Sequence, residues 1–137
     1  MAHQKKIKVL LAQFPLETHS RGIITVAGML KDAGMEVVLM GNALPEQIIE
    51  TAVQEYVDVV GISTYCGGEL ALASDLMKAA EKEGIKERTV FLLGGIFPPG
   101  NAPKLKGIGF SGVFLAATKE EIVSSIENAL VSKKSTS

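Results

Sequence analysis

Short apolar runs alternate along this chain with stretches whose apolar residues are spaced three and four apart. This alternation constrains the fold more than any other feature. The runs predict buried parallel strands, because such strands read as nearly continuous apolar segments. They cover residues 7–14, 35–40, 58–63, 89–95 and 111–116. The helical spacing predicts helices over 20–33, 45–56 and 68–83, and a last helix that Thr118 caps.

Strands that alternate with helices predict an α/β fold. We expect a doubly wound, five-stranded parallel sheet between two helical layers, a three-layer αβα arrangement of the flavodoxin or Rossmann-like type. Right-handed crossovers leave few topologies, and we expect strand order 2-1-3-4-5. The stretch 97–107 is the longest segment expected to be irregular. The chain of 137 residues has the size of a single domain over 1–137, with a core at about 5–130 and a polar tail from 132.

Charge and cysteine content narrow the functional classes. The net charge is −1, and the 14 Lys and Arg residues are scattered, so no basic surface for nucleic acid or for an anionic membrane is expected. The single Cys66 excludes an internal disulfide and is typical of a reducing cytoplasm, where we expect the protein. No apolar run has the length of a membrane span, and the N-terminus lacks the pattern of a signal peptide.

The loops that follow the strands are the expected ligand-binding edge. In doubly wound sheets ligands bind at the carboxyl ends of the strands, near the point where the strand order reverses. The loops expected there are 14–20, 64–68, 95–103 and 116–118. One of the two histidines, His19, lies on the first of these loops, with Glu17 two residues before it and Gly22 three residues after it.

Residue types at this edge exclude several common sites. A dinucleotide or Walker phosphate site needs a glycine-rich turn after the first strand, whereas this chain has bulky residues in "QFPLETHSRG". A phosphate-accepting signalling domain of this fold needs acidic residues at the ends of the first and third strands. Those strands end in Gln13-Phe14 and Ser63-Thr64.

Three interpretations of His19 remain open on residue types alone. It is a surface-loop histidine, a metal ligand oriented by Glu17, or a partner of Cys66 in a nucleophilic pair. A zinc site built from Glu17, His19 and Cys66 matches no strong spacing pattern. One histidine holds a bare ion poorly, but it can fill one axial position of a metal already bound in a macrocycle.

Three short motifs occur in order along the chain. They are Glu17-Thr18-His19-Ser20-Arg21-Gly22, then after 40 residues Ser63-Thr64-Tyr65, then after 28 residues Gly94-Gly95. Residues 5–130 thereby resemble the cobalamin (vitamin B12)-binding domain of adenosylcobalamin-dependent mutases. That family carries Asp-x-His-x-x-Gly, then Ser-x-Leu, then Gly-Gly at similar gaps. Arg21 beside Gly22, and "GGIFPP" from Gly94, are most similar to the acyl-CoA mutase branch, such as methylmalonyl-CoA mutase.

The resemblance implies a role for each motif residue. His19 would be the lower axial ligand of the cobalt, in place of the dimethylbenzimidazole of the cofactor's nucleotide tail, and Glu17 would orient it. Ser63 would hydrogen-bond the displaced benzimidazole, while glycines leave room for the tail. The full set of expected cofactor-binding residues is Glu17, Thr18, His19, Ser20, Arg21, Gly22, Ser63, Tyr65, Gly94, Gly95 and Thr118.

Four departures from the family pattern leave the affinity open. Glu17 replaces the usual Asp, Tyr65 stands where Leu is usual, and Gln13 occupies a position where the acyl-CoA mutases often have Lys. The segment 115–118 reads "LAAT" where the family tends to have Gly-Pro-Gly-Thr, so the methyl groups of Ala116 and Ala117 are expected to narrow the tail pocket.

The resemblance implies a cofactor-binding subunit with no catalytic residue of its own. In the mutases the radical chemistry takes place in a separate TIM-barrel domain, for which this chain has no room. We therefore expect a cobalamin subunit that serves a larger barrel subunit of an acyl-CoA (methylmalonyl-CoA-like) mutase, an isomerase. Phe97, Pro98 and Pro99 are candidates for the face toward that subunit, or else for local packing. The alternatives are a free-standing corrinoid carrier or sensor, and a divergent domain with a vestigial site. Homo-oligomerisation stays open.

Overall fold

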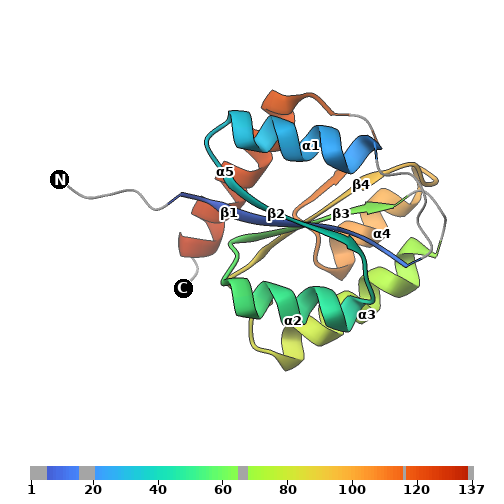
Figure 1. The fold of residues 1–137 in the computed structure, drawn as a ribbon. Coiled ribbons are helices and arrows are strands. Elements are labelled where there is room, and N and C mark those ends of the chain that lie inside the picture. Colours follow the sequence, from blue (N-terminus) through green and yellow to red (C-terminus); the bar gives the residue numbers. More distant parts are fainter. Residues whose placement is uncertain (1–5, 16–20, 65–67, 116, 136–137) are drawn as a thin grey trace.

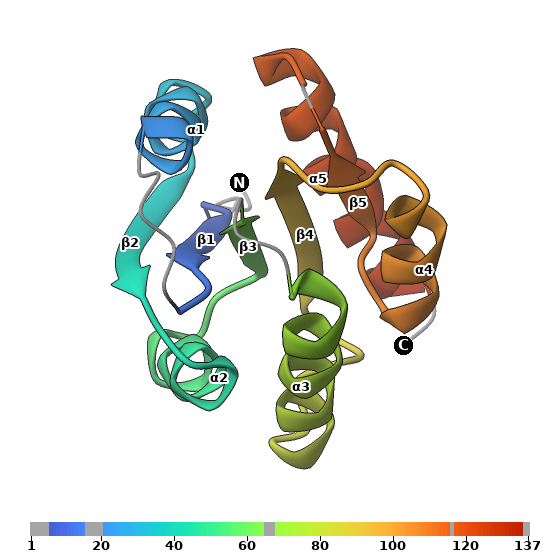
Figure 2. The same cartoon turned by 90° about the vertical axis from the view of Figure 1, so that its right-hand side faces the viewer.

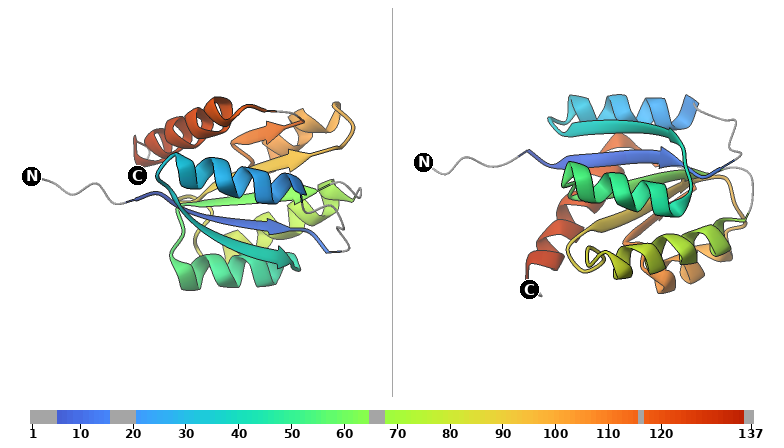
Figure 3. Two further views of the ribbon diagram at one scale, coloured as in Figure 1. Left: turned by 45° about the horizontal axis from the view of Figure 1, so that its top comes forward. Right: turned by 60° about the horizontal axis from the view of Figure 1, so that its bottom comes forward.

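A five-stranded parallel sheet forms the centre of the molecule. The computed structural model describes residues 6–15, 21–64, 68–115 and 117–135. The strands are ordered β2-β1-β3-β4-β5, which confirms the predicted topology (Figure 1). Their bounds are β1 Lys8–Gln13, β2 Glu36–Asn42, β3 Val59–Thr64, β4 Val90–Gly95 and β5 Gly112–Phe114. All of them point to the same edge of the sheet, so their carboxyl ends lie together (Figure 3).

Five helices cover the two faces of this sheet. One face carries α1 and α5, and the other carries α2, α3 and α4 (Figure 2). Their bounds are α1 Arg21–Asp32, α2 Pro45–Glu55, α3 Glu69–Lys82, α4 Asn101–Ile108 and α5 Lys119–Ser135. None of the helices in the described residues is both long enough and apolar enough to cross a bilayer.

Alternate residues of the central strands feed two separate cores. Leu10, Val60 and Phe91 belong to the larger cluster, under α2, α3 and α4. Val9 and Leu92, on the opposite face, belong to the smaller cluster under α1 and α5. Because side chains of a strand alternate between faces, a strand buried on both sides must be apolar throughout. That requirement explains the continuous runs of β1, β3 and β4. The edge strand β2 was also predicted to be buried, and this was wrong, because it has a neighbouring strand on one side only and Leu39 is 49% exposed.

The region 97–107 was predicted to be irregular, and this was wrong for its larger part, since only residues 97–100 lie outside a helix or strand. Residues Asn101–Ile108 form α4, whose Leu105 is completely buried. The prolines of this segment argue against a helix when only the sequence is considered. Pro103, however, lies in the first turn of α4, where a backbone N–H has no partner within the helix. Phe97, which the sequence suggested as a partner-facing residue, is 6% exposed and belongs to the larger core.

Two predicted helix ends are confirmed by backbone geometry. Gly34 follows α1 with a φ of 88°, and Gly84 follows α3 with a φ of 74°. A positive φ at this position lets the chain leave the helix, and glycine adopts it without steric cost.

Substitution of Gly28, inside α1, is expected to stabilise the fold. This residue is exposed, and a Cβ added to it would meet no atom within 4 Å. Since glycine in a helix interior costs about 0.5–1 kcal/mol relative to alanine, Gly28→Ala should raise the free energy of unfolding by about that amount. Urea denaturation measures this change. Gly34→Ala, at positive φ, is the matched variant that should destabilise; an equal effect of both would contradict this account.

Candidate functional site

A cavity of about 780 Å³ lies between the sheet and the α1/α5 layer. It extends from Val9 and Leu92 in the middle of the sheet to Ser63 and Gly95 at the carboxyl ends of β3 and β4. Figure 2 shows α1 and α5 over the same face of the sheet, α1 to the left and α5 to the right. The edge is the one where doubly wound folds bind ligands.

Small residues in neighbouring strands form the floor of the cavity. Gly61 and Ser63 lie two apart on β3, and Ser63 is paired in register with Gly94 on β4. Residues two apart in a strand share a face, so three adjacent positions here carry almost no side chain. A Cβ at Gly61 would lie 2.7 Å from Leu11 Cδ2. The cavity is therefore deep at this point because these residues have little or no side chain.

Gly95 is the last floor residue of the cavity, and its position does not accept a side chain. Its φ is 142°, and a Cβ there would overlap the carbonyl oxygen of Thr64 on β3. The same oxygen accepts a hydrogen bond from the Ile96 N–H at 3.1 Å. The chain therefore turns tightly against β3 directly after the cavity-lining glycines.

Among the residues that the structure describes, the lining of the cavity is almost entirely apolar and includes no ionisable side chain. Its polar side chains are the hydroxyls of Ser63 and Thr25. Within the part of the chain that the structure describes, the half-buried Ser63 hydroxyl has no hydrogen-bond partner. Such a site suits a flat, largely apolar group with one hydrogen-bonding atom near the end of β3.

Four of the sequence-predicted site residues come together at this cavity. Gly22 reaches it from the first turn of α1, and Ser63, Gly94 and Gly95 reach it from the ends of β3 and β4. Arg21 begins α1. Glu17, Thr18, His19, Ser20, Tyr65 and Cys66 lie outside the described residues, so their roles stay predictions.

Thr118 is described, but it does not line the cavity. Its hydroxyl accepts a hydrogen bond from the Glu121 N–H at 3.2 Å, and its own N–H donates to Glu121 Oε1 at 3.3 Å. This reciprocal pair is a capping box, and the predicted cap of the last helix is thereby confirmed. Contact of Thr118 with a cofactor stays a prediction.

Sequence reasoning missed the helical walls of the cavity. One face of α1 supplies Thr25, Val26 and Met29, and the β5–α5 region supplies Phe114, Ala117 and Ile122. Of these residues, only Ala117 was expected at the pocket, because helical periodicity identifies the inward face of a helix but not what lies beneath it. Ala117 lines the cavity, in line with the expectation that its methyl group narrows the pocket.

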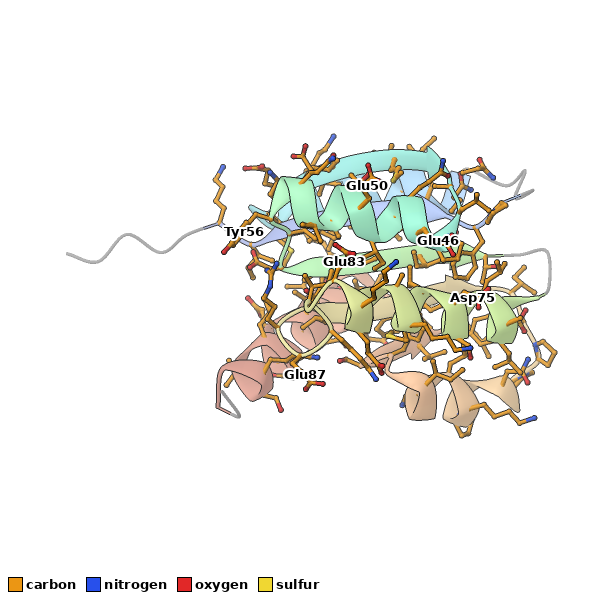
Figure 4. All side chains as sticks on the ribbon, turned by 90° about the horizontal axis from the view of Figure 1, so that it is seen from below. Glu46, Glu50, Tyr56, Asp75, Glu83 and Glu87 are labelled. Atoms are coloured by element: carbon orange, nitrogen blue, oxygen red, sulfur yellow. The ribbon has the colours of Figure 1, made fainter. Side chains whose placement is uncertain are left out.

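The opposite face carries a cavity of a different chemistry. It measures about 360 Å³ and is lined by Glu46 and Glu50 of α2 and by Lys82 and Glu83 at the end of α3. Figure 4 shows the three glutamates on this face. No three metal-ligating side chains gather anywhere in the described residues. The charged lining makes this cavity unsuitable for a largely apolar ligand.

Comparison with known proteins identifies relatives that cover nearly the whole chain. The family model described as "B12 binding domain" matches residues 7–124. The 2-hydroxyisobutanoyl-CoA mutase small subunit of Aquincola tertiaricarbonis is 35% identical over 132 residues, which are 95% of this chain and 96% of that protein. The pivalyl-CoA mutase small subunit of Xanthobacter autotrophicus is 35% identical over 89% of this chain and 82% of its own length. Methylmalonyl-CoA mutase of Escherichia coli is 30% identical over 80% of this chain, which corresponds to 15% of that larger protein.

Solved structures agree on the fold. A cobalamin-binding protein from Desulfitobacterium hafniense superposes with a TM-score of 0.78 at 19% identity, over 90% of this chain and 59% of that one. A response regulator receiver domain from Clostridium thermocellum reaches 0.71 at 14% identity, over 96% and 99%. Because both identities are low, these likenesses show the architecture alone.

Proposed function

Because the chain belongs to the B12-binding domain family, we propose that it is the cobalamin-binding subunit of a carbon-skeleton mutase that acts on an acyl-CoA. Two relatives that match it almost end to end are small subunits of acyl-CoA mutases. In methylmalonyl-CoA mutase of Escherichia coli the matching region is only 15% of the protein, so the rest of that mutase lies in the same chain. Here the corresponding part would be a separate, larger subunit.

The cavity beneath α1 and α5 carries this proposal, because it fits the nucleotide tail of cobalamin. Larger side chains in place of Gly61, Ser63 and Gly94 on its floor would occupy the cavity. Its described lining is apolar apart from two hydroxyls. The Ser63 hydroxyl would donate a hydrogen bond to a nitrogen of the tail's benzimidazole. Gly22 and Gly95 would let the backbone approach the tail closely.

His19 is proposed as the lower ligand of the cobalt, with Glu17 as its hydrogen-bond partner. A carboxylate that accepts the second ring N–H fixes the tautomer of a ligating histidine and raises its basicity. Adenosylcobalamin is the form we propose, and when bound it would supply radical chemistry for the reaction in the larger subunit. The role of this chain is to bind, orient and present the cofactor.

Exposed apolar residues at the ligand edge support docking to a larger subunit. Leu44 after β2, Ile96 after β4 and Leu115 after β5 are 51%, 67% and 44% exposed. All three follow carboxyl ends of strands, at the edge where the cavity lies. Large apolar side chains left in water at one edge are typical of an interaction surface.

Binding of adenosylcobalamin to the purified protein tests the proposal. We expect the absorption change of tail displacement, and a nitrogen hyperfine pattern of histidine ligation after reduction of the cobalt. His19→Ala should lose the histidine-ligated form and bind roughly tenfold more weakly, because the cavity still takes the tail. An unchanged hyperfine pattern in the variant would reject His19 as the ligand.

Two further outcomes separate the alternatives. No binding by the wild-type protein would indicate a vestigial site. Tight binding without a co-purifying large subunit, together with mutase activity that the protein fails to restore, would indicate a carrier or sensor. Co-purification of a barrel subunit that depends on the bound cofactor supports the mutase assignment.

A further inference from the structure

A buried carboxylate joins the first residues of α3 and α4, on the face of the sheet opposite the cavity. Glu69, the first residue of α3, is only 4% exposed. Its Oε1 accepts a hydrogen bond of 2.7 Å from Nδ2 of Asn101, the first residue of α4. A buried carboxylate is costly unless polar groups stabilise it, and here the α3 N-terminus and the Asn101 amide do so. Neither residue lines the cavity or belongs to a motif identified in the sequence.

The segment between Gly95 and Asn101 is held at both of its ends. At its start, Gly95 is packed against Thr64, and the Ile96 N–H donates to the Thr64 carbonyl oxygen at 3.1 Å. At its end, Asn101 is bonded to Glu69. The residue that holds the start of the segment, Thr64, is the last of β3. The residue that holds its end, Glu69, is the first of α3, the next element in the chain.

The segment itself is stiff and adjoins the proposed tail-binding floor. Pro98 and Pro99 restrict its backbone, and their carbonyl oxygens accept hydrogen bonds from Asn101 and Ala102 at 2.9 and 3.1 Å. It continues directly from Gly94 and Gly95, and it carries the exposed Ile96. A displacement at its far end would therefore be transmitted to the glycines that line the cavity.

We propose that Glu69 and Asn101 are positioning residues for the cofactor site, and that their hydrogen bond fixes the end of the 96–100 segment to the first residue of α3. The inference rests on the proposed function, because it assigns the pair a role in cobalamin binding. It deepens that function by adding two residues that touch neither the tail nor the cobalt. The pair acts by keeping Gly94, Gly95 and Ile96 in the arrangement that accepts the cofactor.

Paired variants of the full chain test this role. Asn101→Ala removes the donor, whereas Glu69→Gln keeps an acceptor oxygen and serves as the conservative variant. Glu81→Ala removes the exposed 2.8 Å ion pair with Lys86, at the other end of α3, and serves as the control. Two quantities are measured well below the unfolding temperature: the amide hydrogen exchange rate of Ile96 in the free protein, and the dissociation constant for adenosylcobalamin.

Asn101→Ala should speed exchange at Ile96 at least tenfold and weaken cobalamin binding about tenfold. Glu69→Gln should change both by less than about threefold, and Glu81→Ala should change neither. Unchanged exchange at Ile96 in Asn101→Ala overturns the inference, and so does faster exchange with unaltered affinity. A wild-type protein that binds no cobalamin rejects the proposed function instead, and the Ile96 exchange rate then decides alone whether the pair positions the segment.

Discussion

A Gly95→Ala variant is expected to lose both cobalamin binding and a large part of its folding stability. The added Cβ overlaps the carbonyl oxygen of Thr64, which belongs to the backbone of a central strand and cannot rotate away. The backbone at Gly95 also has a φ of 142°, which side-chain-bearing residues rarely adopt. Strain of this kind costs on the order of 1–3 kcal/mol, and overpacking adds a similar amount, against a total stability of about 5–15 kcal/mol.

Urea denaturation and a cobalamin titration measure these two losses. Gly100→Ala is the matched control in the same loop, since Gly100 has a φ of −63° and open space at its Cβ position. We expect it to change the free energy of unfolding by less than about 0.5 kcal/mol. If Gly95→Ala were as stable as this control, the tight turn against β3 would not exist in solution.

The neighbouring Gly94→Phe variant is expected to lose the cofactor and keep the fold. A Cβ at Gly94 would meet only Phe114, at 3.6 Å from its carbonyl oxygen and 3.9 Å from its Cβ, which are ordinary contacts. The side chain would project from the cavity floor, on the same face of β4 as Leu92. It would occupy the volume proposed for the nucleotide tail, so that cobalamin affinity should fall on the order of a hundredfold.

Gly94→Ala provides the graded comparison. A single methyl group should weaken binding by a smaller factor than the aromatic ring, and thermal unfolding of both variants should stay within a few degrees of the wild type. Wild-type affinity in Gly94→Phe would show that the tail does not bind over this floor. A collapse of stability in Gly94→Ala would instead show that Phe114 packs too closely against β4 to leave room for a methyl group.

The topology could be predicted from the sequence because its physical cause is local. A strand buried on both faces must be apolar almost throughout, and this explains the runs at β1, β3 and β4. The run at the edge strand β2 is equally visible in the sequence, although no residue of β2 is fully buried. The helix α4 could not be predicted in this way. Pro98, Pro99 and Pro103 are strong breakers of regular structure, and only the packed structure shows that Pro103 falls where a helix tolerates it. For the same reason the sequence could not decide whether Phe97 faces a partner or packs locally, since its burial depends on the loop that α4 completes.

The site was predictable only in part. Ser63, Gly94 and Gly95 belong to the short motifs, and the strand register places them side by side at the cavity, whereas their contact with a cofactor stays a prediction. Gly61 was missed, because a single glycine inside an apolar strand has no spacing signal. Thr25 and Met29 were missed because the depth of a cavity beneath a helix is a property of the opposite sheet.

The two faces of the sheet differ in what they contribute. The face under α2, α3 and α4 holds the larger buried cluster among the described residues, whereas the face under α1 and α5 holds the smaller one and the cavity. A residue that changes over the second face disturbs few of the contacts that stabilise the first. Substitutions on the face that holds the cavity can therefore change which ligand the protein binds without disrupting its larger core.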